Sequence, residues 1–189
     1  MSFIIRALFF ITAAVASVLS SSGSTLRYIT TTDGLTFGSV TVIMQDPGGM
    51  MRFGTIDGLN LFDGRRLFRF SENIIGHELK GSMVSALATT DDGSTWVQTT
   101  EGLHRYRAFD DLFEFYRDFS ESKGKSEHSL MYSSGNRLYL LAPDGLIYYF
   151  EDGFTDGFQV LQGIDFSPSG IVGIDWSDSE GIVFFCRGW

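Results

Sequence analysis

The side chains best able to bind a metal ion are scarce in this chain and lie far apart. The histidines are His77, His104 and His128, on separate segments, and the only cysteine is Cys186. Zinc sites gather nitrogen and sulfur ligands at short, characteristic spacings, which these residues do not have. A lone cysteine cannot form an intrachain disulfide or a Cys-x-x-Cys redox pair. The sequence therefore predicts no metal site, and it predicts Cys186 as a buried residue of an apolar strand.

The aspartates follow a clearer pattern, because they recur beside glycine at intervals along the chain. They are Asp46, Asp91, Asp92, Asp144 and Asp178. Aspartate before glycine is typical of tight turns, where its carboxylate accepts hydrogen bonds from nearby backbone amides. No nucleophile–base pair, paired-carboxylate motif or phosphate-binding glycine loop accompanies them. We therefore interpret them as turn residues and predict no catalytic residue, no cofactor-binding residue and no cofactor.

These turns belong to a repeated unit that organises the whole chain. Its clearest copy runs from Asp46 to Asp63 and contains two glycine turns nine residues apart. The glycine pairs are Gly49 and Gly58, Gly93 and Gly102, and Gly135 and Gly145, and a fourth copy begins at Gly181. Corresponding glycines are 42 to 46 residues apart. Short β-branched and aromatic runs at this period are typical of four-stranded β-propeller blades, whereas frequent internal glycine excludes a helical repeat.

The predicted fold class is therefore all-β, a β-propeller of four-stranded antiparallel blades, incomplete, with about three and a half blades present. The blades are expected at residues 37–71, 82–117, 128–162 and, incompletely, 170–189. The expected strands are 40–45, 50–56, 59–62 and 66–70, then 84–89, 94–100, 103–107 and 112–116, then 129–133, 137–141, 146–150 and 157–161, and finally 171–176 and 182–187. Because a blade with two strands exposes a sheet edge, we interpret residues 25–189 as part of a larger propeller.

The N-terminus has the pattern of a secretory signal peptide. Arg6 precedes an apolar stretch from Ala7 to Leu19, and small residues follow as far as Ser24. A membrane span usually needs roughly 20 apolar residues. We therefore predict a signal peptide at residues 1–24 and a periplasmic location, with an uncleaved membrane anchor as the alternative. The alternating segment Thr25–Thr31 is predicted to be an outer strand that helps to close the ring.

The composition limits the partners of the folded part. The chain is 43% apolar and 15% aromatic, which predicts a folded core and not a disordered segment. Its formal net charge is −9. A nucleic-acid partner would require a basic surface, so no nucleic acid is expected to bind.

The repeat resembles the two-component regulator propeller repeat, which is found in periplasmic sensor regions of hybrid two-component systems of gut Bacteroidetes. In the first blade the match runs from Val42 to Gly64, with the order Asp, Gly, Phe-Gly-Thr, Asp-Gly-Leu-Asn and Phe-Asp-Gly. The motif residues are Asp46, Gly49, Gly54, Thr55, Gly58, Leu59, Asp63, Gly93, Trp96, Gly102, Leu103, Gly145 and Leu146. The chain departs at Arg52, where the repeat usually has the tryptophan that Trp96 supplies in the second blade. We expect the Arg52 guanidinium to reach solvent or an acidic partner, because burying it unpaired costs several kcal/mol.

The resemblance implies a periplasmic propeller that binds an oligosaccharide and signals to a histidine kinase absent from this chain. Its implied partners are the remaining blades, a second propeller and the membrane-coupled kinase. The alternatives are a secreted propeller enzyme of lyase or lactonase type, a protein-interaction propeller, and a non-functional remnant of a sensor gene. An enzyme would gather unrepeated His, Glu or Asp side chains at the channel mouth. A sensor would present a shallow surface lined by aromatic and amide groups.

Overall fold

The described part of the chain is almost entirely β-structure. The computed structural model describes residues 26–71, 79–108, 112–122, 129–151, 159–161, 171–177 and 181–186. Its helical elements are two three-residue 3₁₀ turns, η1 (Thr31–Asp33) and η2 (Ser120–Ser122). Neither is long or apolar enough to cross a membrane, and the described ranges contain no other helix. The predicted signal peptide at residues 1–24 lies outside these ranges.

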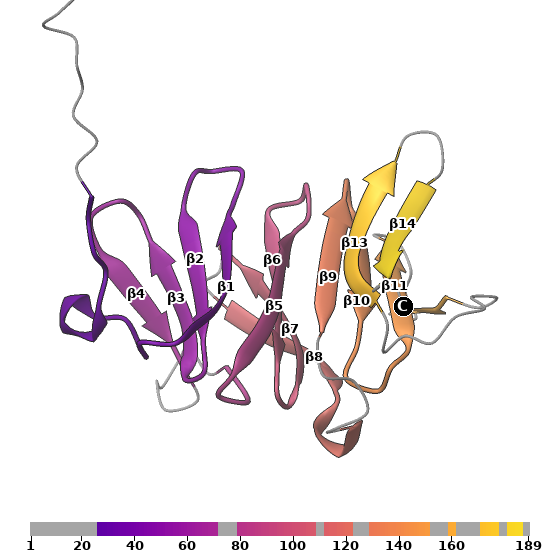
Figure 1. Ribbon diagram of the computed structural model, residues 1–189, viewed down its shortest axis with the longest axis horizontal. Coiled ribbons are helices and arrows are strands. Elements are labelled where there is room, and N and C mark those ends of the chain that lie inside the picture. The colour runs from indigo at the N-terminus through magenta and orange to yellow at the C-terminus, as the bar shows by residue number, and fades with distance from the viewer. Residues whose placement is uncertain are drawn as a thin grey trace, which may run out of the picture.

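The strands form three four-stranded antiparallel sheets and one two-stranded sheet (Figure 1). The first sheet contains β1 (Val40–Gln45), β2 (Met51–Thr55), β3 (Gly58–Phe62) and β4 (Leu67–Phe70). The second contains β5 (Val84–Thr89), β6 (Ser94–Thr99), β7 (Gly102–Arg107) and β8 (Leu112–Asp118). The third contains β9 (Leu130–Ser134), β10 (Arg137–Leu141), β11 (Ile147–Glu151) and β12 (Gln159–Val160), and the last contains β13 (Ile171–Ser177) and β14 (Gly181–Cys186). Every strand predicted within the blades is confirmed to within two residues at each end.

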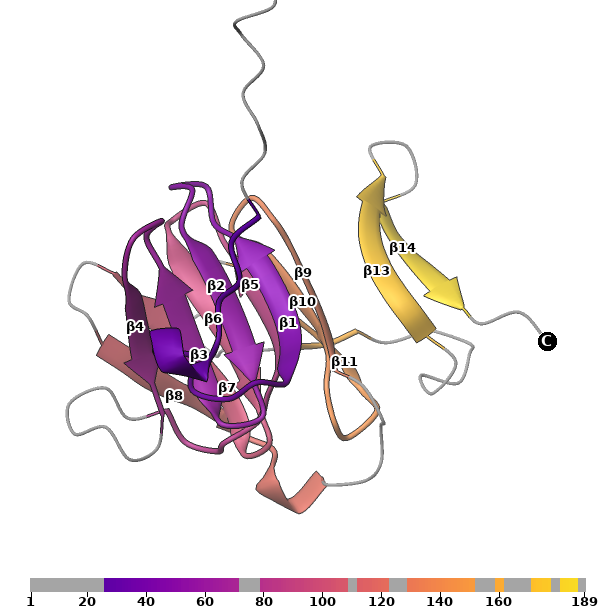
Figure 2. The same ribbon diagram turned by 60° about the vertical axis from the view of Figure 1, so that its left-hand side comes forward.

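The sheets are arranged as consecutive blades of a propeller. Strands pair in chain order within each sheet, and the first strand of each sheet lies beside the first strand of the next, β1 by β5, β5 by β9 and β9 by β13. Figures 1 and 2 show the sheets fanned side by side around these inner strands. The described strands form three full blades and one two-stranded sheet, without a closed ring. This arrangement confirms the predicted fold class.

The inner three strands of the first two blades repeat each other in register at a spacing of 44, whereas the outer pair β7–β8 has a register shift that β3–β4 lacks. Arg52 pairs with Met44 and Leu61, and Trp96 pairs with Ala88 and Arg105 at the equivalent positions. The inner strands β1 and β5 also share a register irregularity at the same place, before Val42 and before Ala86 respectively. A bulge that occurs at the same position in successive blades is part of the repeated fold and not a local irregularity. The sequence period is therefore a true structural period.

A threonine fastens the two-residue hairpin between the second and third strands of both blades. Thr55 Oγ1 donates to the carbonyl of Gly58 at 3.0 Å and accepts the Asp57 amide at 3.0 Å. Thr99 makes the same two contacts around Gly102. A Cβ added to Gly102 would collide with the backbone carbonyl of Arg117. The motif residues Thr55, Gly58 and Gly102 therefore hold strands together.

The third blade uses its glycine turn in a different hairpin. The loop at residues 142–146 repeats the backbone bonds of 46–50 and 90–94, but it joins β10 to β11 instead of the first two strands. Leu146 is 45% exposed, whereas Leu59 and Leu103 are fully buried. The repeat motif predicts that Gly145 and Leu146 are equivalent to Gly58 and Leu59. In the structure this longer turn moves Leu146 out of the core position.

The predicted outer strand at Thr25–Thr31 does not form in its described part, residues 26–31. Asp33 Oδ2 accepts hydrogen bonds from the Thr30 amide and hydroxyl, both at 2.9 Å, and these bonds stabilise η1 instead. Local side-chain bonds of this kind compete with strand pairing. The segment runs over the first blade, where the Arg27 guanidinium lies 5.2 Å from the centre of the Phe62 ring. This prediction was therefore wrong for the described residues.

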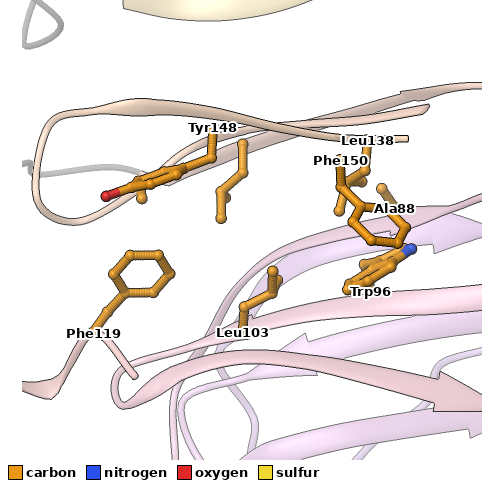
Figure 3. Close-up of a cluster of buried hydrophobic side chains, with 9 residues drawn as sticks. Ala88, Trp96, Leu103, Phe119, Leu138, Tyr148 and Phe150 are labelled. Atoms are coloured by element: carbon orange, nitrogen blue, oxygen red, sulfur yellow. The ribbon is translucent and has the colours of Figure 1, made fainter. Parts of the chain in front are cut away.

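Apolar clusters fill the spaces between neighbouring blades. The cluster between the second and third blades is drawn in Figure 3 and is centred on Trp96, which is fully buried. Its other members are Ala88, Leu103, Phe119, Leu138, Leu140, Ala142, Tyr148 and Phe150. The ring centres of Trp96 and Phe150 are 5.1 Å apart. Trp96 packs between blades, as its recurrence in the repeat predicts.

Candidate functional site

A groove crosses the ends of the inner strands of the three full blades. It encloses about 420 Å³. Its lining residues are Met44, Gln45, Asp46, Pro47, Leu87, Ala88, Thr89, Met131, Tyr132 and Ser133. Inner strands border the central channel of a propeller, so their ends surround one mouth of that channel. The groove is the candidate binding site of this chain.

The lining follows the 44-residue period across all three blades. Gln45, Thr89 and Ser133 are at equivalent places, and Leu87 and Met131 are equivalent as well. The side chains at these places differ in size and polarity from blade to blade. The groove therefore combines a repeated backbone with an unrepeated set of side chains.

Two hydroxyl groups of the groove direct their protons into the protein. Thr89 Oγ1 donates to Met44 Sδ at 3.6 Å. Ser133 Oγ donates to the carbonyl oxygen of Thr89 at 2.7 Å, which joins the inner strands β5 and β9. A hydroxyl has one proton and two lone pairs. In this arrangement the lone pairs of both hydroxyls remain for a ligand, and the Ser133 proton is the more firmly held because a carbonyl oxygen accepts more strongly than a thioether sulfur.

Asp46 is the charged residue of the lining, and it is held by Arg52. Asp46 Oδ2 accepts from Arg52 Nη2 at 2.9 Å, and Asp46 Oδ1 accepts from the Met50 amide at 3.0 Å. The Arg52 side chain is 3% exposed, and its guanidinium carbon lies 5.6 Å from the centre of the Tyr106 ring. Burial lowers the pKa of Arg52, and the charge of Asp46 opposes that shift. The expected acidic partner of Arg52 is therefore confirmed.

The other aspartates of the repeat serve their turns. Asp144 Oδ1 accepts the Leu146 amide at 3.0 Å, and Asp63 Oδ1 accepts two amides of its own turn. Asp92 accepts from Thr90, Ser94 and Arg105. Burial raises the pKa of Asp92, but these hydrogen bonds outweigh it and lower the pKa to about 2. Asp178 lies outside the described residues.

The predicted motif residues do not converge on one place. Among them, only Asp46 lines the groove. The remaining motif residues lie in turns, hairpins or spaces between blades. Tyr132, Met131 and Ser133 line the groove without belonging to the motif. In the sequence they are marked only by lying 44 residues after positions 87–89. That offset indicates a shared site once the inner strands are known to lie side by side.

The histidines do not form a metal site in the described part of the chain. No group of three or more His, Cys, Asp or Glu side chains there could hold a metal ion. His77 and His128 lie outside the described residues, and the side chain of Cys186 is not described. His104 is 1% exposed, and its Nε2 accepts the Lys80 amide at 3.2 Å. In the first blade, the equivalent Asn60 Oδ1 accepts the Thr36 amide at 2.9 Å.

His104 should make the chain sensitive to acid. Burial lowers its pKa from 6.5 to about 4, although backbone carbonyls of Val97 and Gly102 oppose the shift. A folded-state pKa below the unfolded value means that stability is fully present above pH 6.5 and is lost as pH falls toward 4. The loss should reach roughly 3 kcal/mol, since one pKa unit corresponds to about 1.4 kcal/mol.

The substitution His104→Asn tests this effect, because Asn60 already fills the equivalent position. We expect the variant to lose roughly 3 kcal/mol less than the parent protein when pH falls from 7 to 4. Urea unfolding at both pH values measures the difference, and the titration of all other groups cancels in the comparison. Equal acid sensitivity of the two proteins would contradict a buried neutral His104.

Comparison with known proteins finds similar folds but no matching sequence family. No protein-family model and no curated protein matches the chain. Solved structures do match it. The extracellular domain of the putative hybrid two-component system BT3049 from B. thetaiotaomicron is 22% identical over 77% of this chain and 20% of that chain, with a TM-score of 0.58.

Two further solved structures are similar. The extracellular domain of the putative one-component system BT4673 from B. thetaiotaomicron is 14% identical over 86% of this chain and 25% of that chain, with a TM-score of 0.64. PorZ, a bacterial surface component of the type-IX secretion system of Porphyromonas gingivalis, is 12% identical over 84% of this chain and 21% of that chain, with a TM-score of 0.56. This chain thus spans a quarter or less of these structures, and it shares its fold with extracellular domains of Bacteroides two-component and one-component systems, in agreement with the resemblance of its repeat.

Proposed function

We propose that this chain is part of a periplasmic ligand-sensing propeller and that its groove binds an oligosaccharide. The observation that carries the proposal is the groove itself, which crosses the ends of the inner strands β1, β5 and β9. Propeller folds offer such strand ends as binding surfaces because unrepeated side chains can vary there without cost to the core. Fold similarity to extracellular domains of two-component systems supports a sensing role.

The groove has the mixed chemistry that sugar rings require. A sugar presents C–H groups on its faces and hydroxyl groups on its rim. Met44, Met131 and Tyr132 offer apolar and aromatic surface, while Gln45 and Asp46 offer polar groups. Aromatic rings with a polar end are favoured where one face of a ligand is apolar and its edge is hydrated. This combination supports a shallow saccharide site.

The enzyme alternative has less support in the described residues. No histidine or glutamate is among the described residues that line the groove. The lining carboxylate, Asp46, already accepts bonds from Arg52 and Met50. A general acid or base should be within hydrogen-bond reach of substrate and have a pKa near the working pH. A carboxylate tied to a buried arginine is poorly suited to that task.

The remaining parts of the proposal come from the sequence and the resemblance. Residues 1–24 would export the chain as a signal peptide, and the mature part would begin near residue 25. The oligosaccharide signal would pass through the rest of a larger sensor to a membrane-coupled histidine kinase. Protease accessibility in intact and osmotically shocked cells would locate the mature chain.

Binding of neutral hexasaccharides tests the site. The probes are glucose hexamers with α-1,4, β-1,3 or β-1,4 linkages and a mannose hexamer with β-1,4 linkages, measured by saturation-transfer NMR and calorimetry on the full chain. We expect at least one to bind and Tyr132→Ala to weaken its binding about tenfold or more, because the ring would cover roughly 60 Å² of apolar sugar surface at about 25 cal/mol per Å². Leu112→Ala, at an exposed residue of β8, is the control. Absence of binding by every hexamer, or unchanged binding by Tyr132→Ala, would refute the site.

A further inference from the structure

The hydrogen-bonding groups of the groove are unbalanced, with acceptors outnumbering donors. The Thr89 and Ser133 hydroxyls both use their protons within the protein, at Met44 Sδ and the Thr89 carbonyl. Each oxygen of Asp46 has accepted one bond and retains further acceptor capacity, because an ionised carboxylate has about four lone-pair sites. Gln45 uses one N–H on the Gly49 carbonyl at 3.3 Å. The side-chain donors of the lining are the second N–H of Gln45 and the hydroxyl of Tyr132, which are fewer than its acceptors. The groove therefore suits a ligand that supplies protons.

The charged groups of the groove also favour a ligand that donates protons, because the lining has a carboxylate and no basic side chain among the described residues. No lysine, arginine or histidine is among the described residues that line it. The cation that balances Asp46 is Arg52, but Arg52 is more deeply buried than Asp46, with side chains 3% and 10% exposed. The carboxylate therefore stands between the guanidinium and the groove. A ligand in the groove meets the negative member of the pair first.

We propose that the groove selects donor-rich, uncharged saccharides and rejects those that carry carboxylate or sulfate groups. This inference rests on the proposed function, and it assigns Asp46 as the residue that sets the selectivity. A neutral sugar donates its hydroxyl protons to Asp46, Thr89 and Ser133. An acidic sugar would place its negative charge against the Asp46 carboxylate, with no basic side chain in the lining to offset it.

Matched pairs of ligands test the selectivity. Each neutral hexamer named above is compared with the same hexamer after oxidation of its primary alcohols to carboxylates. We expect the oxidised form of the binding hexamer to bind at least about tenfold more weakly at low salt, as one unfavourable charge contact suffices for that factor. Added salt should reduce the difference, because it screens repulsion between exposed charges.

A charge-free groove provides the matched variant. In the second blade, Thr90 and Trp96 occupy the positions of Asp46 and Arg52, and Trp96 Nε1 donates to Thr90 Oγ1 at 3.3 Å. The double variant Asp46→Thr/Arg52→Trp therefore copies a pair that this fold already accepts. We expect the oxidised and neutral hexamers to differ less than about threefold in affinity for this variant. Circular dichroism melting verifies that it folds.

The outcomes separate the two proposals. If no hexamer binds in either form, the proposed function fails, and the selectivity with it. If a neutral hexamer binds and its oxidised form binds equally well or better, the selectivity is refuted while the proposed function stands. If discrimination persists unchanged in the folded double variant, Asp46 does not set it, and the assignment is refuted.

Discussion

Replacing Asp46 with alanine is expected to lower the free energy of unfolding by about 3–5 kcal/mol. The substitution removes the salt-bridge partner of Arg52, whose side chain is 3% exposed. Arg52 Nε and Nη1 already have no hydrogen-bond partner in the structure. The variant would therefore leave a guanidinium buried between two blades, with the Tyr106 ring near its charge and no carboxylate bonded to it among the described residues. Urea unfolding at pH 7 measures the loss.

An exposed ion pair is the control for this prediction. Arg137 Nε and Glu151 Oε1 are 2.7 Å apart, but both side chains are well exposed. Glu151→Ala should cost less than about 1 kcal/mol, because surface pairs are screened by water. If Asp46→Ala costs no more than Glu151→Ala, the buried pair does not carry the stability ascribed to it.

Adding Arg52→Trp should restore the stability that is lost when Asp46 is replaced. The equivalent Trp96 pairs with Ala88 and Arg105 and is accommodated by the same backbone. Replacing a buried ion pair with apolar side chains of similar size is often neutral or stabilising by about 1–4 kcal/mol. We therefore expect Asp46→Thr/Arg52→Trp to be at least as stable as the parent. Arg52→Trp alone should gain less, because it leaves the Asp46 carboxylate without its partner. A fall of several degrees in the thermal midpoint of the double variant would show that this site requires the ion pair.

Trp96→Ala should destabilise the chain by about 3–5 kcal/mol as well, through loss of packing. Trp96 is fully buried between the second and third blades and makes an edge contact with Tyr116, with ring centres 5.1 Å apart. Figure 3 shows it beside Phe150. The alanine would leave a cavity at the contact that joins these blades. Thermal and urea unfolding would record the loss.

Hydrogen exchange adds a positional test of the same variant. Because Trp96 faces the third blade, the amides of β10 and β11 should lose more protection than those of β1 and β2. Phe68→Ala, at a side chain that is 46% exposed, is the control and should cost well under half as much. Uniform loss of protection across all blades would contradict a local role for Trp96 at one interface.

The architecture followed from the sequence because the repeat is local and redundant. A glycine turn, an aromatic strand and a second glycine turn recur at a nearly constant period, and each copy supports the reading of the others. Blade strands pair with their neighbours along the chain, so short-range patterns also give the sheet order. Where local signals conflict, the prediction was weaker. The segment before Asp33 alternates like a strand, but its threonine and aspartate side chains bond to each other and to the backbone.

Local patterns were enough to predict that this chain is all-β, that its strands follow a blade period and that its recurring aspartates lie at turns, because each strand and turn is set by residues close to it in the chain and the unit then recurs. The contact of Arg52 with Asp46, and the groove that Asp46 lines with Thr89 and Ser133, depend instead on how the strands pack in three dimensions. Residues 46, 89 and 133 are brought together by the packing of inner strands from three blades. Such a meeting leaves no mark on local composition, and the directions of the Thr89 and Ser133 protons depend on acceptors supplied by neighbouring inner strands.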